Sequence, residues 1–183
     1  MNTENKVISE KLAQSEPFVC QVVGYKNSGK TTLVCSLVEK LNEQGYQVAV
    51  IKHDAHDFEM DQPGTDSYRH RAAGASAIAL VSSRKTAVIR EEEIALDELV
   101  MGFSEYDMVL VEGFKQERYP KLVMIRTAED RELISSLASV IGVVTWLPVE
   151  ETLAGLDVNT AGKLAVFGKD DVEQIADWIQ KHR

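Results

Sequence analysis

The chain has 183 residues, 44% of them hydrophobic, and a net charge of -9 at pH 7. This length suits one α/β domain with a modest insertion. The acidic excess argues against a nucleic-acid partner, because neutralising a phosphate backbone needs clustered Lys and Arg. The longest apolar runs, such as 77–81 and 108–111, are too short to cross a bilayer, so we expect no membrane partner.

The first 16 residues are polar and mixed in charge, without the apolar stretch of a secretory signal. We therefore expect a polar N-terminal tail over 1–16, a folded domain over 17–183 and a cytoplasmic protein. The two cysteines, Cys20 and Cys35, show neither a CxxC motif nor a zinc-ligand spacing. Each falls within a predicted strand or helix, so we interpret both as buried free thiols.

Strands and helices are predicted to alternate along the chain. Residues 18–23 form a short apolar strand that ends at Gly24, 31–44 form an amphipathic helix, and 47–52 form a second strand. This order is the βαβ unit of a parallel sheet. The pattern then predicts helices at 65–73, 96–103 and 170–182, and strands at 76–82, 85–90, 108–111, 122–125, 140–144 and 164–167.

This alternation predicts an α/β fold, with a mostly parallel sheet covered by helices on both faces. Ligands of such sheets bind at the carboxyl ends of the strands. Three segments are therefore expected around one cleft, namely 24–30, 52–57 and 112–115.

The segment that follows the first strand matches the phosphate-loop pattern G-x4-G-K-[ST] in full and directly precedes a helix. Backbone N–H groups and the helix N-terminus of such a loop bind phosphate oxygens. In this pattern Lys30 reaches the β- and γ-phosphates, and the Thr31 hydroxyl ligates Mg2+. A nucleoside triphosphate with Mg2+ is thus predicted to contact Gly24, Tyr25, Lys26, Asn27, Ser28, Gly29, Lys30, Thr31 and Thr32.

A phosphate loop also needs an acidic residue near the metal, usually at the end of another buried strand. Glu112 follows the apolar residues 108–111, where an unpaired carboxylate would be costly. We predict that Glu112 lies on the magnesium side of the site, directly or through a water. The alternative is that a neighbouring Lys or backbone amides hold this carboxylate.

A polar cluster of Lys52, His53, Asp54, His56 and Asp57 follows the second strand. It could contact a phosphate or a second anionic substrate, ligate a metal ion, or remain solvated, and His-x-x-His alone is a weak metal signal. We favour contacts with a substrate or a phosphate for Lys52, His53, His56 and Asp57. If the bound nucleotide is hydrolysed, Asp54 or His56 could orient the water that attacks the terminal phosphate. Asp54 is therefore a catalytic candidate together with Lys30 and Glu112.

Two further cations are candidates for contacts with an anion. Arg69 follows Asp66 by one helical turn, so it could clamp a phosphate or form an ordinary surface ion pair. Lys115 comes three residues after Glu112 and faces either the same cleft or solvent.

Four sequence blocks, in their order and spacing, resemble the molybdopterin-guanine dinucleotide biosynthesis adaptor proteins, the MobB family. The blocks are 24–32, Ile51-Lys52-His53, the segment 63–75 beginning Pro-Gly-Thr-Asp-Ser, and Val111-Glu112-Gly113-Phe114-Lys115. The resemblance runs from about residue 18 to the C-terminus. It implies a P-loop protein that binds GTP, hydrolyses it weakly with Mg2+ and acts mainly as an adaptor.

The resemblance also implies partners. They are the guanylyltransferase that attaches GMP to molybdopterin, the molybdopterin-type cofactor itself, and a second copy of the chain. An inserted β-hairpin at about 76–90 would contribute to this homodimer. The guanylyl transfer would belong to the partner enzyme.

Two departures from related patterns matter. The signature lysine of dimeric ATPase relatives would follow the first glycine, where this chain has Tyr25, and Lys26 comes one residue later. A lysine acting across a dimer is therefore not supported. No Asn-Lys-x-Asp guanine motif follows the strand at 140–144, so the preference for guanine rests on the resemblance alone.

Two other classes of P-loop protein are alternatives. A metal-insertion GTPase would want a closed Cys or His cluster, and His53 with His56 is too little for one. A small-molecule kinase or ATP-dependent ligase would want an acceptor pocket with a poised base, for which Asp54, Asp57 or Glu112 could serve. A kinase would also be favoured by a flexible lid rich in arginine. No such lid is evident, because Arg69, Arg71 and Arg84 are scattered along the sequence.

Overall fold

The computed structural model describes residues 16–54 and 58–183. The described residues form two compact units. The main unit comprises the segments up to His53 and from Leu96 onward, and the inserted unit comprises Asp54–Ala95. Of the tail expected over 1–16, only Glu16 belongs to the described residues.

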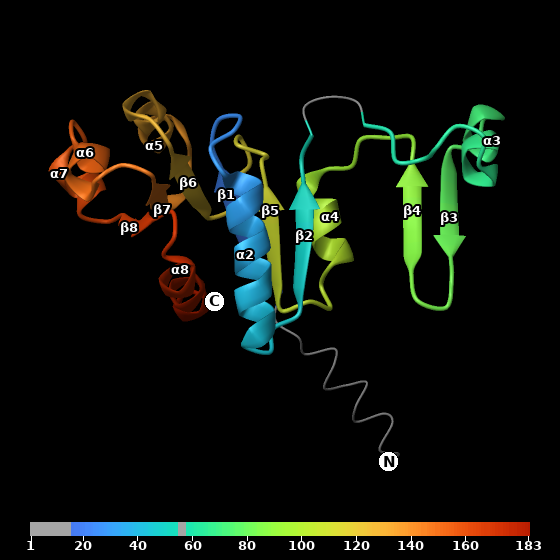
Figure 1. The fold of residues 1–183 in the computed structure, drawn as a ribbon, viewed down its shortest axis with the longest axis horizontal. Coiled ribbons are helices and arrows are strands. Elements are labelled where there is room, and N and C mark those ends of the chain that lie inside the picture. The colour runs from blue at the N-terminus through green and yellow to red at the C-terminus, as the bar shows by residue number, and fades with distance from the viewer. Residues whose placement is uncertain (1–15, 55–57) are drawn as a thin grey trace, which may run out of the picture. The chain divides into compact units, whose positions relative to one another are not determined.

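The main unit is built on a six-stranded sheet in the order β2-β5-β1-β6-β7-β8 (Figure 1). All five strand pairs are parallel, which agrees with the predicted class of fold. The strands are apolar because helices cover the sheet on both sides. Their bounds are β1 Phe18–Val23, β2 Val48–Lys52, β5 Met108–Glu112, β6 Lys121–Ile125, β7 Val140–Thr145 and β8 Ala165–Gly168.

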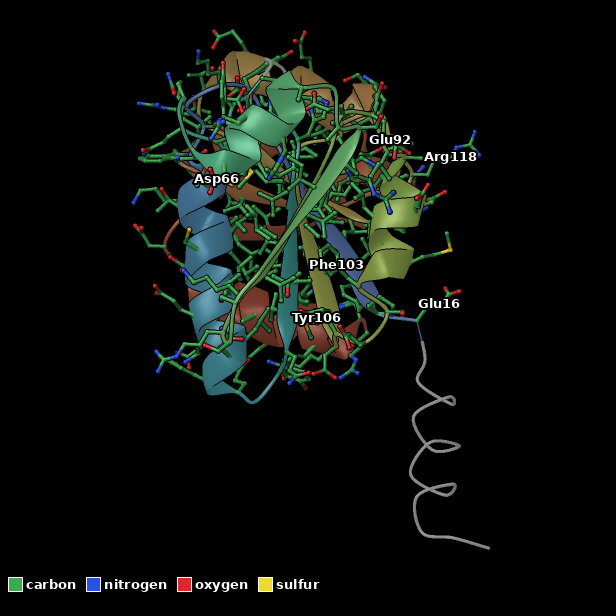
Figure 2. All side chains as sticks on the ribbon, turned by 90° about the vertical axis from the view of Figure 1, so that its right-hand side faces the viewer. Glu16, Asp66, Glu92, Phe103, Tyr106 and Arg118 are labelled. Atoms are coloured by element: carbon green, nitrogen blue, oxygen red, sulfur yellow. The ribbon has the colours of Figure 1, made fainter. Side chains whose placement is uncertain are left out.

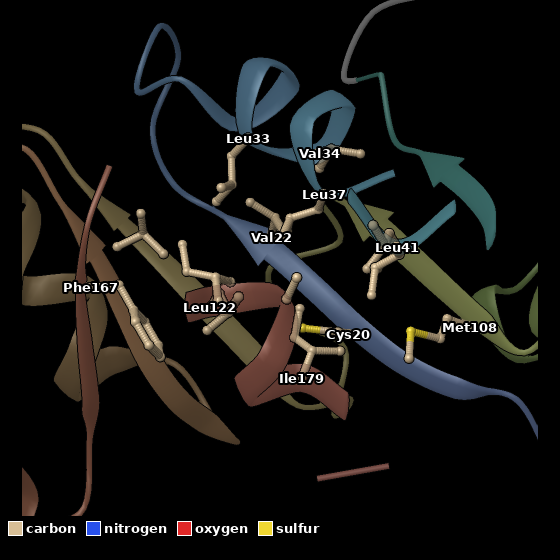
Figure 3. Packing of buried hydrophobic residues seen from close by; sticks show 14 of the residues in the cluster. Cys20, Val22, Leu33, Val34, Leu37, Leu41, Met108, Leu122, Phe167 and Ile179 are labelled. Atoms are coloured by element: carbon tan, nitrogen blue, oxygen red, sulfur yellow. The ribbon is translucent and has the colours of Figure 1, made fainter. Parts of the chain in front are cut away.

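One face of this sheet packs against α2 (Lys30–Glu43) and α8 (Val172–Lys181). Successive side chains of a strand point to opposite faces, so Cys20 and Val22 of β1 both turn to this side. Figure 3 shows them packed among buried side chains of α2, α8 and neighbouring strands. The buried side chains of α2 form one stripe along the helix, made of Leu33, Val34, Leu37 and Leu41.

The other face of the sheet is covered by shorter helices. Val19 of β1 turns to this side and packs with Leu96 and Val100 of α4 (Leu96–Gly102). Just after α4, the rings of Phe103 and Tyr106 meet edge to face with centroids 5.5 Å apart and flank the same cluster (Figure 2). Further along the sheet, the helix α5 (Glu132–Ser136) contributes Leu133 and Ile134 to a third cluster.

Four short helical segments of the main unit are not predicted by the sequence pattern. They are η1 (Ala128–Arg131), α5, α6 (Val149–Leu153) and α7 (Val158–Ala161), each of only four or five residues. A segment of this length shows little more than one turn of hydrophobic periodicity.

The inserted unit contains α3 (Asp66–Ala72) and an antiparallel hairpin of β3 (Ala77–Val81) and β4 (Thr86–Arg90). The Thr65 side chain accepts a hydrogen bond from the backbone N–H of Tyr68 and so caps α3. These elements agree with the helix at 65–73 and the two strands at 76–82 and 85–90 expected from the sequence.

The two cysteines differ in exposure. Cys20 is fully buried in β1, and burial raises the pKa of its thiol to about 12. Cys35 is exposed, so the prediction of a buried thiol is wrong there. The physical reason is helical phase, because Cys35 lies one residue beyond Val34 and therefore about 100° round α2 from the buried stripe. No helix in the described parts of the chain is long and apolar enough to span a membrane.

Candidate nucleotide-binding site

The phosphate loop joins β1 to α2 at the carboxyl end of the sheet (Figure 1). A Cβ at Gly24 would meet Ser28 Oγ at 2.7 Å and Met124 Cβ at 2.9 Å, so no side chain fits there. Asn27 (φ 63°) and Gly29 (φ 99°) are both left-handed, a geometry of backbone nests that bind anions. A cavity of about 350 Å3 is lined by Asn27, Gly29, Lys30, Thr31 and Thr32.

Lys30 is folded back onto its own loop. Its Nζ donates a hydrogen bond to the Tyr25 carbonyl oxygen at 2.7 Å. Burial lowers the pKa of Lys30, because desolvation disfavours the charged ammonium. A phosphate group in the loop would offer this ammonium a negatively charged acceptor in place of the neutral carbonyl.

Glu112 lies beside the first turn of α2. The Thr31 hydroxyl donates to Glu112 Oε1 at 2.8 Å, and Glu112 is only 6% exposed. Lys52 Nζ lies 3.5 Å from the same carboxylate oxygen. The contact with Thr31 corresponds to the predicted magnesium side, because it brings together a hydroxyl and a carboxylate suited to Mg2+. The contact with Lys52 corresponds to the alternative, because the lysine offsets the buried charge of Glu112.

The turn after β5 brings Lys115 to the phosphate loop. Gly113 (φ 98°) and Phe114 (φ 53°) are both left-handed. Gln21, buried in β1, holds this turn by donating from Nε2 to the carbonyl oxygens of Gly113 at 3.0 Å and Phe114 at 2.8 Å. Lys115 Nζ then lies 4.4 Å from the centroid of the Tyr25 ring, within cation–π range.

Comparison with known proteins identifies the family. Residues 19–146 match the family described as MobB, Molybdopterin guanine dinucleotide synthesis protein B. The chain belongs to the MobB family.

Relatives cover most of the chain. A Haemophilus influenzae protein named molybdopterin-guanine dinucleotide biosynthesis adapter protein is 37% identical over 150 residues, covering 80% of this chain and 84% of that protein. An Escherichia coli protein of the same name is 36% identical over 166 residues, covering 86% and 90%. The crystal structure of a MobB homolog from Bacillus stearothermophilus has a TM-score of 0.68 at 30% identity and covers 90% of this chain and 96% of that chain. This likeness confirms the predicted α/β fold.

The remaining candidates of this MobB-family chain differ in their surroundings. The His53 ring packs on Phe114 with centroids 4.6 Å apart, while Lys26 is exposed. Asp54 and Arg69 belong to the inserted unit, where the 76% exposed Arg69 side chain lies 3.7 Å from Asp66, as in the ion-pair alternative. His56 and Asp57 lie outside the described residues. Within 16–54 and 58–183, no group of three or more His, Cys, Asp or Glu side chains could hold a metal ion.

Sequence reasoning missed several residues that contact the phosphate loop. Trp146 and Arg126 donate to its backbone, and the Tyr25 hydroxyl donates to Glu132. That bond is the main reason why the pKa of Tyr25 is raised. Trp146 and Arg126 directly follow β7 and β6, so their only signal in the sequence is their position at the carboxyl ends of predicted strands, whereas Glu132 begins α5 and carries no such signal.

The inserted unit of this MobB-family chain holds an ion-pair cluster that was also missed. Arg71 donates to both carboxylate oxygens of Glu59, and its Nε lies 2.6 Å from Glu91 Oε1. A third carboxylate, Asp61, lies 3.7 Å from Arg71 Nη1. The hydrogen bond from Arg71 lowers the pKa of Glu59. The cluster joins the segment before α3, α3 itself and the end of the hairpin.

Proposed function

We propose that this chain binds GTP with Mg2+ and acts as an adapter in the biosynthesis of the molybdopterin guanine dinucleotide. In this role it assists the guanylyltransferase that joins GMP to molybdopterin, and it hydrolyses GTP only weakly. The observation that carries the proposal is the contact between Thr31, in a complete phosphate loop, and the buried Glu112 of β5. The names of its relatives support the adapter role.

The residues of the site fit a magnesium nucleotide. Thr31 and Glu112 offer the oxygen ligands that Mg2+ prefers, either directly or through its waters. When bound, the ion would neutralise charge on the phosphate oxygens. Lys30, now on the Tyr25 carbonyl, would turn to the β- and γ-phosphates.

We expect GTP hydrolysis to be slow, below about 1 per second, at the low end of the enzyme range. In several P-loop GTPases a glutamine orients the attacking water. Gln21 lies next to the phosphate loop in the sheet, but its amide donates to Gly113 and Phe114. A turnover well above about 1 per second in the purified protein would contradict this expectation.

Three lysines near the carboxyl ends of the strands could contact a second anionic group. Lys30, Lys52 and Lys115 are close enough for the charges of the other two to lower the pKa of Lys30, although burial is the larger cause. Glu112 is the counter-charge that Lys30 and Lys52 share. We assign Lys52 and Lys115 to contacts with the nucleotide or with the phosphate of a molybdopterin-type cofactor.

The inserted hairpin is our candidate for the homodimer contact. Leu80, Val81 and Val88 are 44%, 75% and 60% exposed on a two-stranded sheet. A two-stranded sheet has little stability of its own, and exposed apolar residues gathered on one element are typical of interaction surfaces. A second copy of the chain would cover them.

The test is calorimetric titration of GTP and ATP into the protein, with and without Mg2+. We expect tight, magnesium-dependent binding of GTP, weaker binding of ATP, and loss of both in Lys30→Ala. Retained affinity in Lys30→Ala would refute the phosphate-loop assignment. Equal or tighter binding of ATP would favour the kinase or ligase alternative. The adapter role is tested separately by adding the chain to a guanylyltransferase assay, where a rise in dinucleotide yield is expected with wild type and not with Lys30→Ala.

A further inference from the structure

Two side chains that follow β7 and β6 donate hydrogen bonds to backbone carbonyl groups of the phosphate loop. Trp146, just after β7, donates from Nε1 to the Ser28 carbonyl oxygen at 3.0 Å. Arg126, just after β6, donates from Nη1 to the Asn27 carbonyl oxygen at 2.5 Å. The backbone N–H of Trp146 is in turn bonded to Ile125 O at 2.9 Å, so both donors rest on the sheet.

These bonds fix the orientation of peptide groups in the loop. In a trans peptide the C=O and the following N–H point in opposite directions. The Ser28 carbonyl points to Trp146, so the N–H of Gly29 points away from the indole, and Gly29 lines the cavity of the loop. Asn27 is left-handed, which is unfavourable for a residue with a Cβ, and Arg126 secures its carbonyl in that conformation.

The indole itself is held on several sides. A Cβ built at Gly29 would lie 3.5 Å from Trp146 Cζ2, so the ring packs directly against the loop. Lys169 Nζ and Arg126 Cζ lie 4.8 Å and 5.4 Å from the ring centroid, within cation–π range. Trp146 is nevertheless 46% exposed, so its burial in a core does not explain this arrangement.

We propose that Trp146 and Arg126 are positioning residues for the triphosphate. They orient the peptide groups of residues 27–29 so that the loop is already shaped for phosphate oxygens before the ligand arrives. The inference rests on the proposed nucleotide binding and adds to it, because it assigns part of the affinity to two side chains outside the phosphate-loop motif. Since both act on the loop backbone, they serve the phosphates rather than the base.

The test compares Mg2+-tripolyphosphate, which has no base or ribose, with Mg2+-GTP in calorimetric titrations. Trp146→Phe keeps an aromatic ring but removes the N–H donor, and Arg126→Met removes the other donor at an exposed position. Each variant should weaken both ligands by a similar factor, about tenfold for one lost hydrogen bond. The control is Trp178→Phe, because the other tryptophan of the chain lies in α8 against Phe167 and should leave both affinities unchanged.

A spectroscopic readout separates positioning from general stability. In Trp178→Phe the only tryptophan left is Trp146, and its fluorescence should shift when Mg2+-tripolyphosphate fills the loop. Wild-type affinity for tripolyphosphate in both Trp146→Phe and Arg126→Met would overturn the inference. So would a loss confined to GTP, which would assign Trp146 to the base. Failure of the wild-type chain to bind either ligand would instead overturn the proposed function, and this role with it.

Discussion

At the residue scale, Gly24 shows how space rather than backbone conformation selects a residue in the phosphate loop. Ser28 Oγ and Met124 Cβ stand within 3 Å of the place where a Cβ would lie. Gly24→Ala should therefore displace the loop and weaken GTP binding about tenfold or more. Gly102→Ala is the matched control, because nothing lies within 4 Å of its Cβ position. Calorimetry of the two variants checks this, and equal affinities would contradict the close approach at Gly24.

Glu112 permits a second prediction at this scale. Glu112→Gln keeps the shape of the side chain and an acceptor for Thr31 but removes the charge that Mg2+ and Lys52 would share. We expect a higher magnesium concentration to be needed for half-maximal GTP binding, with a smaller effect on the melting temperature. Glu105→Gln, an exposed change of the same kind, serves as the control. An unchanged magnesium titration would move the metal role away from Glu112.

At the element scale, the inserted unit depends on one cluster of charges. The pKa of Glu59 is lowered by its hydrogen bond from Arg71. A carboxylate with a lowered folded pKa stabilises the folded state above its unfolded pKa of about 4.3, and that contribution is lost as the pH falls through the folded value. The protection of the hairpin amides against hydrogen exchange, measured relative to an unfolded peptide at the same pH, should therefore fall below about pH 4. Glu59→Gln should remove this acid dependence, whereas Glu93→Gln, also exposed, should retain it.

The elements also show what could be predicted from the sequence. The helix α2 was predicted because Leu33, Leu37 and Leu41 repeat at helical spacing over 14 residues. The helices α5, α6 and α7 were missed because four or five residues cannot display that repeat. The phosphate loop is contiguous in sequence, so its motif marked it directly.

The partners of the loop could not be predicted in the same way. Trp146 reaches Ser28 across 118 residues of sequence, and that contact exists only because β7 lies two strands from β1 in the sheet. Gln21 carries no motif at all, and its bonds to Gly113 and Phe114 follow from the parallel pairing of β1 with β5. Such residues are assigned by tertiary structure, and local patterns do not mark them.

At the scale of the whole molecule, the exposed hairpin predicts a change in assembly. Val88→Lys places a charge on an apolar strand. A dimer formed through the hairpin should therefore dissociate at a higher protein concentration than the wild-type dimer does. Val158→Lys is the control, since this valine is 87% exposed on α7 of the main unit. Light scattering across a dilution series gives the mass of each variant. A wild-type chain that stays monomeric at high concentration would remove the basis of the dimer proposal.

The order of the strands has a consequence for synthesis on the ribosome. The phosphate loop leaves β1 early in the chain, but β1 sits between β5 and β6, and its first residue Phe18 pairs with Met108. No hairpin joins neighbouring strands of this sheet, so the nascent chain cannot complete the ladder beside the loop until β6 has emerged. Trp146, which orients the loop, is made later still. A nascent chain thus carries the complete phosphate-loop motif well before it has the residues that shape that loop to hold a nucleotide.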